Sequence, residues 1–256
     1  MLSGLPMTTE NTKTWRRLTA GIVLTAFVIR LLQLGYAAKS PLTYQLGPDE
    51  DYYLQFSKAI LEGNISNPAF GLMDPLFAYI LAGVGGNQFL LFILQVVVDA
   101  GTTYAIALAG RMLGKPASGL IGALLYATCS IALVYDTALL KATWVAATLA
   151  WWLVLAISAT RTNHRTSLFF LGLLVGFGIT LRGNLALLAI LTVVVVPWAA
   201  SKQTTASGLR AADKALRSGL LVTSGLLFPL TLAYIHYQQI DGRHALLPNN
   251  GGIVLH

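Results

Sequence analysis

The sequence predicts an all-α fold, a polytopic membrane bundle of about seven transmembrane helices with amphipathic helices in its first outward-facing loop. Of the 256 residues, 55% are hydrophobic and 11% are charged, and the mean hydropathy is +0.67. In a soluble domain, roughly a quarter of all residues are charged. The apolar residues also gather in runs that approach the ~20 residues needed to cross a bilayer core. Lipid is therefore the predicted solvent for most of the surface.

Seven apolar runs supply the predicted spans: 18–38, 89–108, 117–134, 142–158, 168–181, 185–200 and 220–235. The last three are shorter, so they are expected to tilt little or to begin within flanking polar residues. The first run follows a basic segment, as in a signal peptide, but it is long for one. Six later spans would keep the chain in the membrane in either case.

The distribution of charge predicts the orientation. If the spans alternate sides, one set of connections holds eleven of the seventeen basic residues: Lys13, Arg16, Arg17, Arg111, Lys115, Arg161, Arg165, Lys202, Arg210, Lys214 and Arg217. The opposite set holds seven of the ten acids: Asp49, Glu50, Asp51, Glu62, Asp74, Asp136 and Asp241. The positive-inside rule places the basic set and the N-terminus in the cytoplasm. Together these features predict a multi-pass inner-membrane protein.

The loop 39–87 is the predicted functional segment, because it is too long and too varied in composition to be a simple turn. Pro48 and three following acids predict a helix over 48–61, since proline and acids suit the first helical turn. An apolar stripe from Tyr53 suits a helix on the membrane surface. Gly63-Asn64 would end it, and the apolar run 75–84 predicts an interfacial helix or a lead-in to the next span.

The organisation predicted from these runs is a transmembrane domain over 1–235, followed by an outward-facing region over 236–256 that reads as the truncated start of a longer protein. The net charge of +7 does not indicate nucleic acid, because the basic residues follow the topology of the spans. Cys129 is the single cysteine and cannot form an internal disulfide. A phosphate-binding glycine loop and a nucleophile elbow are both missing from the sequence.

Several short motifs follow one another along the chain. They are Arg30-Leu31-Leu32, Asp49-Glu50-Asp51-Tyr52-Tyr53, Asp74-Pro75-Leu76-Phe77, Gln95 with Asp99, Gly110 to Gly114, Tyr135-Asp136 with Leu139-Leu140-Lys141, Leu181-Arg182-Gly183-Asn184, and Asn249 to Ile253. In this order they resemble the GT-C glycosyltransferases of the protein-mannosyltransferase and aminoarabinose-transferase type. The family's Pro-Pro-Leu stretch lacks its first proline here.

The resemblance implies transfer of a sugar from a polyprenyl-phosphate donor to a hydroxyl of a glycan, lipid or protein acceptor on the periplasmic face. It assigns the general base to Asp49, with Glu50 beside it and Tyr53 one helical turn away. The leaving phosphate is a stable anion, so one acid and one cation suffice, in contrast to glycoside hydrolysis. The alternative is that these acids only complement a helix dipole. No cofactor is expected.

Arg182 is the preferred cation for gripping the donor phosphate, with Lys141 and Lys58 as weaker candidates. An alternative role for Arg182 is snorkelling to lipid headgroups. Arg30 and Asp99 lie within spans, where ionisable groups usually pair, and Arg30 is a structural or donor-contact candidate. Asp136 either joins the wall of the site or is a solvated turn acid.

A divalent metal held by Asp49, Glu50, Asp51 and Asp74 is conceivable chemically but is not the prediction. His164, His236, His244 and His256 lack metal-ligand spacing. The competing functions are a transporter, which would place polar groups midway along several spans and show repeated halves, and a non-catalytic scaffold or inactive fragment. Polar groups at the outer ends of the spans favour the transferase.

Overall fold

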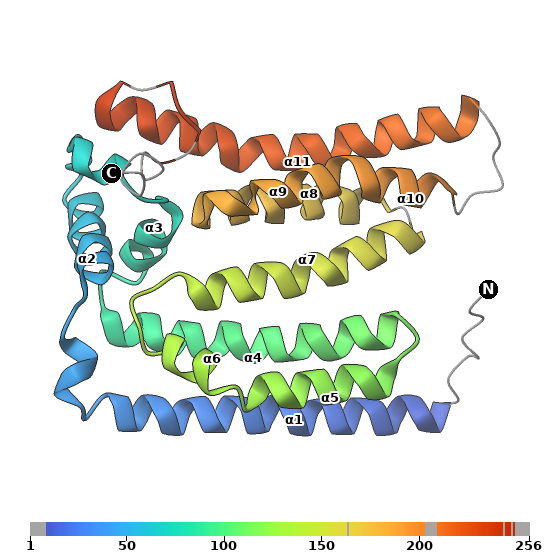
Figure 1. The fold of residues 1–256 in the computed structure, drawn as a ribbon, viewed down its shortest axis with the longest axis horizontal. Coiled ribbons are helices and arrows are strands. Elements are labelled where there is room, and N and C mark those ends of the chain that lie inside the picture. Colours follow the sequence, from blue (N-terminus) through green and yellow to red (C-terminus); the bar gives the residue numbers. More distant parts are fainter. Residues whose placement is uncertain (1–8, 163, 203–208, 243, 247, 249–256) are drawn as a thin grey trace. The chain divides into compact units, whose positions relative to one another are not determined.

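A computed structural model describes residues 9–162, 164–202, 209–242, 244–246 and 248 (Figure 1). These residues form helices and turns and contain no β-strand, which confirms the all-α prediction. They divide into two compact units. The first unit draws on 1–45, 92–138 and 142–154, and the second on 46–91, 139–141 and 155–256.

Every predicted span coincides with one or more helices. The elements are α1 Thr9–Ala37, η1 Pro41–Tyr44, α2 Pro48–Leu61, η2 Pro68–Gly71, α3 Leu76–Gly83, α4 Gln88–Met112, α5 Pro116–Ala127, α6 Ser130–Tyr135, α7 Ala142–Thr162, α8 Arg165–Leu181, η3 Gly183–Leu185, α9 Ala186–Ile190, η4 Leu191–Val195, α10 Val196–Lys202 and α11 Leu209–Asp241. Within the described residues, four helices are long and apolar enough to cross a membrane: Glu10–Ala37, Gln88–Met112, Ala142–Thr162 and Ala212–Ile240.

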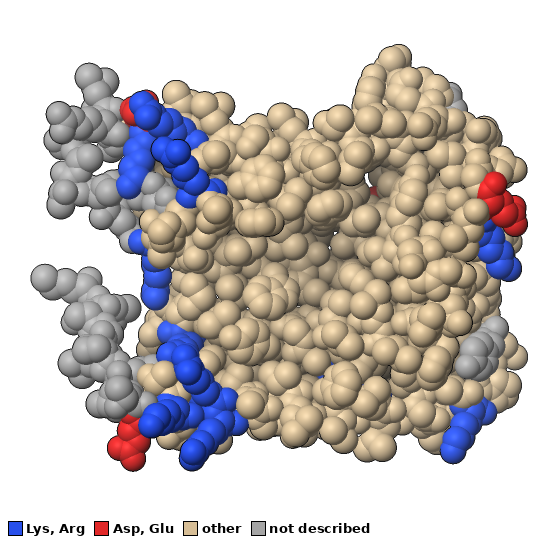
Figure 2. Space-filling view, turned by 180° about the vertical axis from the view of Figure 1, so that it is seen from behind, with Lys and Arg blue, Asp and Glu red and all other residues tan. Residues whose placement is uncertain are grey.

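The helix surfaces have the character of a membrane protein. Large apolar side chains are exposed along the helices, among them Leu32 at 69%, Leu187 at 74% and Phe170 at 54%. On the face drawn in Figure 2, charged side chains gather near helix ends and leave wide flanks without charge. Exposed apolar surface of this extent indicates a lipid environment.

In the first unit, the single span predicted over 117–134 is wrong as one continuous helix. α5 ends at Ala127, Cys129 adopts an extended conformation, and α6 begins at Ser130. The carbonyl of Ala127 accepts a hydrogen bond from Arg30 at 3.1 Å, so a buried side chain satisfies a group that a continuing helix would have paired. α4 and α5 approach closely, since a Cβ on Gly110 would lie 2.3 Å from the Cα of Gly119.

In the second unit, α8 and α11 lie side by side along much of their length (Figure 1). Glycines allow this packing: a Cβ on Gly172 would lie 1.9 Å from the carbonyl oxygen of Val222, and one on Gly225 would lie 2.2 Å from that of Phe169. Close approach through small residues is a common mode of packing between membrane helices. α11 also continues to Asp241, past the predicted end at 235, and Tyr237 and Ile240 are buried on that last stretch.

The segment between α1 and α4 contains two separate α-helices and two short 3₁₀ helices. α2 spans Pro48–Leu61, the bounds that the sequence predicts, and α3 follows as a helix of its own. The apolar stripe of α2 faces protein, however. Tyr53 and Phe56 are almost fully buried, the ring of Tyr53 meets Phe77 at 4.9 Å, and Phe56 stacks on Phe70 at 4.5 Å. The expectation that this stripe rests on the membrane surface is therefore wrong.

Candidate functional site

The first turn of α2 presents three acids that differ in their partners. Glu50 uses both carboxylate oxygens: Oε2 accepts the Gly47 N–H at 2.9 Å, and Oε1 accepts the Leu139 N–H at 3.1 Å. The first contact caps the helix start, and the second fixes the chain before α7 against α2. Glu50 is thus a positioning residue in this geometry.

Asp49 is the acid of this turn whose carboxylate is available to bind another molecule. Its side chain is exposed, whereas Asp51 accepts a hydrogen bond from Gln55 at 2.6 Å. Among these three acids, only Asp49 forms no hydrogen bond or ion pair with another described residue. A carboxylate with free lone pairs at a helix N-terminus can accept a proton or bind a donor group.

Asp74 joins three segments that are far apart in the sequence. Its carboxylate pairs with the ammonium of Lys141 and accepts the Gly183 N–H at 3.2 Å, while the side chain itself is 3% exposed. Burial raises the pKa of Asp74, although Lys141, the Gly183 N–H and Arg182 oppose this rise. Asp74 therefore holds the 139–141 segment and the end of α8 at one place.

Tyr53 is influenced by the charges of two carboxylates, Asp49 and Asp74. Its hydroxyl is buried and has no hydrogen-bond partner among the described residues, and the Lys141 ammonium lies 5.9 Å from the centre of its ring. Burial raises the pKa of Tyr53, and the nearby charges of Asp74 and Asp49 raise it further. The phenol stays protonated at neutral pH, so it can donate a hydrogen bond.

Arg182 lies at the end of α8, in an extended conformation between α8 and η3. Its side chain is exposed, and its charge lowers the pKa of Asp74, whose carboxylate accepts the N–H of the next residue, Gly183, at 3.2 Å. We call Asp49, Tyr53, Asp74, Lys141 and Arg182 the carboxylate–cation cluster. All five belong to the second unit.

Four of these five are site residues that the sequence predicts, and Asp74 is the exception. In the sequence, Asp74 enters only the metal-site alternative and the motif that lacks its first proline. The signal that could have identified it is its position directly before Pro75 and an apolar run, where an acid requires a partner. Lys58, which with Lys141 is a weaker cation candidate than Arg182, is exposed near the end of α2.

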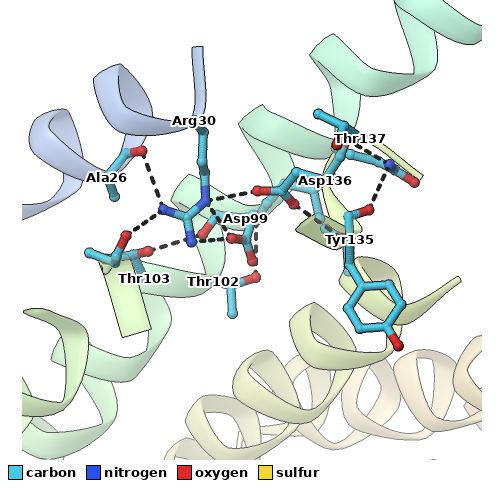
Figure 3. Close-up of polar contacts among 12 residues, drawn as sticks. Ala26, Arg30, Asp99, Thr102, Thr103, Tyr135, Asp136 and Thr137 are labelled. Carbon is cyan, nitrogen blue, oxygen red and sulfur yellow. Dashed lines mark hydrogen bonds and ion pairs between the residues drawn. The ribbon is translucent and has the colours of Figure 1, made fainter. Parts of the chain in front are cut away.

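Arg30 belongs to a different set of contacts, in the first unit (Figure 3). The guanidinium pairs with Asp99 and lies 3.0 Å from Asp136. It also donates to the carbonyl of Ala26 at 3.2 Å, and Tyr126 donates to Asp99. Arg30, Asp99 and Asp136 are each at most 1% exposed, so this is a buried ion-pair network.

The network confirms one expectation and corrects another. Pairing of Arg30 with Asp99 is confirmed, but Asp136 is not a solvated turn acid, because it is buried against Arg30 and accepts a hydrogen bond from Thr143 at 3.1 Å. Enclosure of the guanidinium favours the structural role for Arg30 over the donor-contact role. Neither Arg30 nor Asp136 lies in the unit that carries Asp49.

Gln95 fixes the turn that carries Asp136. Its Nε2 donates to the carbonyls of Asp136 and Ala138, each at 3.0 Å, and its Oε1 accepts the indole N–H of Trp144 at 3.3 Å. Gln95 is completely buried. A buried amide that satisfies several backbone groups holds a turn rigidly, so Gln95 fixes the backbone from Asp136 to Ala138.

A metal site is not assembled within the part of the chain that the structure describes, since no three His, Cys, Asp or Glu side chains gather in a suitable group. The four acids considered for this purpose instead take the separate roles given above. The motif at 249–253 and His256 lie outside the described residues. The resemblance to GT-C glycosyltransferases accordingly stays a prediction from the sequence. No family model, curated protein or solved structure matches the chain.

Proposed function

We propose that the chain is an integral-membrane glycosyltransferase that transfers a sugar from a polyprenyl-phosphate donor to an acceptor hydroxyl. In this proposal the seven apolar segments all span an inner membrane, the N-terminus is cytoplasmic, and α2 and α3 lie on the periplasmic face. The charge distribution supports this orientation, because basic residues concentrate in one set of connections. The carboxylate–cation cluster then lies where a lipid headgroup meets water.

One observation carries the proposal: an unengaged carboxylate, Asp49, occurs in the same cluster as two cations. Sugar transfer from a phosphate donor requires a base for the acceptor hydroxyl and positive charge for the leaving phosphate. Asp49 supplies the first, and Arg182 and Lys141 supply the second. Tyr53 adds a buried hydroxyl that has no partner among the described residues.

The chemical step balances with these groups. The acceptor oxygen attacks the anomeric carbon while its proton passes to a carboxylate oxygen of Asp49. The bond between the anomeric carbon and the phosphate oxygen breaks, and the polyprenyl phosphate leaves with the bonding electron pair. Arg182 is exposed and has a fork of donors that matches phosphate oxygens. Lys141 is held in place by Asp74 but keeps 21% of its side chain exposed.

The remaining residues position this chemistry. Glu50 ties α2 to the segment before α7, and Asp74 ties that segment to the end of α8. These contacts bring residues from three parts of the sequence into one cluster. Loss of either carboxylate is expected to displace Lys141, so their effects on transfer are expected to be indirect.

The reaction class is tested with membranes that contain the chain and membranes that lack it. Both are supplied with a pool of radiolabelled polyprenyl-phosphate sugars, and label that reaches glycan, lipid and protein fractions is measured. The proposal predicts label in one of these fractions only when the chain is present. Equal labelling in both membranes would contradict it.

A transporter is the second candidate, and the buried network of Arg30, Asp99 and Asp136 is the observation that favours it. Asp99 lies near the middle of α4, and charges within spans often line a transport path. The charges are mutually paired, however, and the sequence shows no internal repeat. Movement of labelled polyprenyl-phosphate sugar between the two leaflets of vesicles that contain the chain, without covalent transfer, would support the transporter and contradict the transferase.

A further inference from the structure

We infer that a groove between α1 and α4 binds an anionic glycerophospholipid from the surrounding bilayer. The groove has a volume of about 680 Å³ and lies entirely within the first unit. Its walls come from the first two thirds of α1, including Trp15, Arg16, Thr19 and Phe27, and from the C-terminal half of α4, including Tyr104 and Arg111.

The groove changes from basic to apolar along its length. Arg16 lies at one end and Phe27 at the other, with Val23 and Leu24 between them. These eleven helical steps correspond to about 16 Å, close to half of a hydrocarbon core of about 30 Å. A lipid with its headgroup near Arg16 and one acyl chain beside Phe27 matches the groove both in length and in its change from polar to apolar.

The basic end is built to face an anion. Arg111 lies with its guanidinium 4.4 Å from the ring centre of Trp15, and this contact holds the guanidinium over the indole while its N–H groups remain available. Arg16 is exposed on the other wall. Two guanidinium groups next to an apolar groove select a phosphate that carries a net negative charge.

Two buried donors give independent support. The indole nitrogen of Trp15 and the hydroxyl of Thr19 have no hydrogen-bond partner among the described residues, although the two side chains are only 5% and 3% exposed. Buried donors without acceptors are uncommon, and an additional bound molecule is one way to satisfy them. A small turn of either side chain toward the groove would bring its donor to a phosphate or ester oxygen of a phospholipid.

The occupant is therefore a lipid and not a soluble phosphate or a second helix, because the walls combine a cationic end with an apolar length that faces the bilayer. The inference needs only the membrane character of the helices. It does not depend on the proposed transferase, and the two can fail separately.

The test is native mass spectrometry of the full chain, purified in detergent, stripped of lipid and titrated with dioleoyl-phosphatidylglycerol or dioleoyl-phosphatidylcholine. The chain is expected to bind the anionic lipid more tightly. Arg16→Gln should weaken that binding about fivefold, and its matched control Arg17→Gln, an exposed neighbour outside the groove, should leave it unchanged. Equal binding of both lipids, or equal loss in the two variants, would overturn the inference.

A second pair of variants tests whether a lipid occupies the groove, by blocking the groove with a large side chain. Ala20→Phe fills the groove, and Thr25→Phe adds the same side chain to an exposed position of α1 outside it. Loss of phosphatidylglycerol binding is expected for Ala20→Phe alone. Unchanged binding in Ala20→Phe, or a dimer without bound lipid in every variant, would contradict a lipid-filled groove.

Discussion

Asp74 and Lys141 form an ion pair that connects the segment between α1 and α4 with the chain that leads into α7. The carboxylate is almost completely buried, and the ammonium is 21% exposed. The two residues therefore do not contribute equally, since loss of the cation strands a buried charge whereas loss of the acid leaves an ammonium that can reach water.

Lys141→Met is expected to lower the free energy of unfolding by about 2 to 3 kcal/mol, somewhat below the range for a fully buried pair because Lys141 is partly exposed. Asp74→Asn is expected to cost less. In the double variant the two losses should not add, because the pair is removed as a unit. The free energy of unfolding is measured in mixed micelles for the unchanged chain, the two single variants and the double variant. Additive losses would show that the ion pair contributes nothing to stability.

Close packing of α8 and α11 gives a second prediction. Gly172→Ala would place a Cβ 1.9 Å from the carbonyl of Val222, so the helices must separate, at a cost of about 1 to 3 kcal/mol. The matched control is Gly21→Ala in α1, where a Cβ meets nothing within 4 Å. This control should be neutral or more stable by about 0.5 to 1 kcal/mol. Similar melting temperatures for the two variants would argue against the packing.

The proposed orientation predicts opposite accessibility at two exposed positions, Glu62 after α2 and Lys115 before α5. In a Cys129→Ala background, Glu62→Cys should react with a membrane-impermeant maleimide in intact cells. Lys115→Cys should react only after the membrane is permeabilised. Both cysteines reacting in intact cells, or the reverse order, would contradict the orientation.

Sequence reasoning located α2 accurately because local signals specify both ends. Pro48 and the acids after it favour a helix start, and Gly63 stops the helix with a φ of 72°, in the region that glycine adopts readily. The pairing of Arg30 with Asp99 was also predictable, since charges within apolar runs need partners. The first inference depends on near neighbours in the sequence, and the second depends on residue type, since the two paired residues are 69 positions apart.

The remaining features depend on contacts that the sequence does not display. The break at Cys129 lies inside a continuous apolar run, and the side chain that satisfies the freed carbonyl of Ala127 comes from Arg30 in α1. Asp74 meets Lys141 and Gly183, which are 67 and 109 residues away. Burial of Tyr53 likewise follows from where α3 packs. A periodic stripe does not reveal whether protein or lipid covers it.

The central claim is that Asp49 is the base of the transfer reaction. The most direct measurement is the rate of sugar transfer from a radiolabelled polyprenyl-phosphate donor by membranes containing equal amounts of the chain, Asp49→Asn or Asp51→Asn. The account predicts that Asp49→Asn lowers the rate about 10²- to 10⁴-fold, while Asp51→Asn, in the same helical turn and bonded only to Gln55 among the described side chains, retains most of it. Full activity in Asp49→Asn, or an equal loss in both variants, would contradict the account.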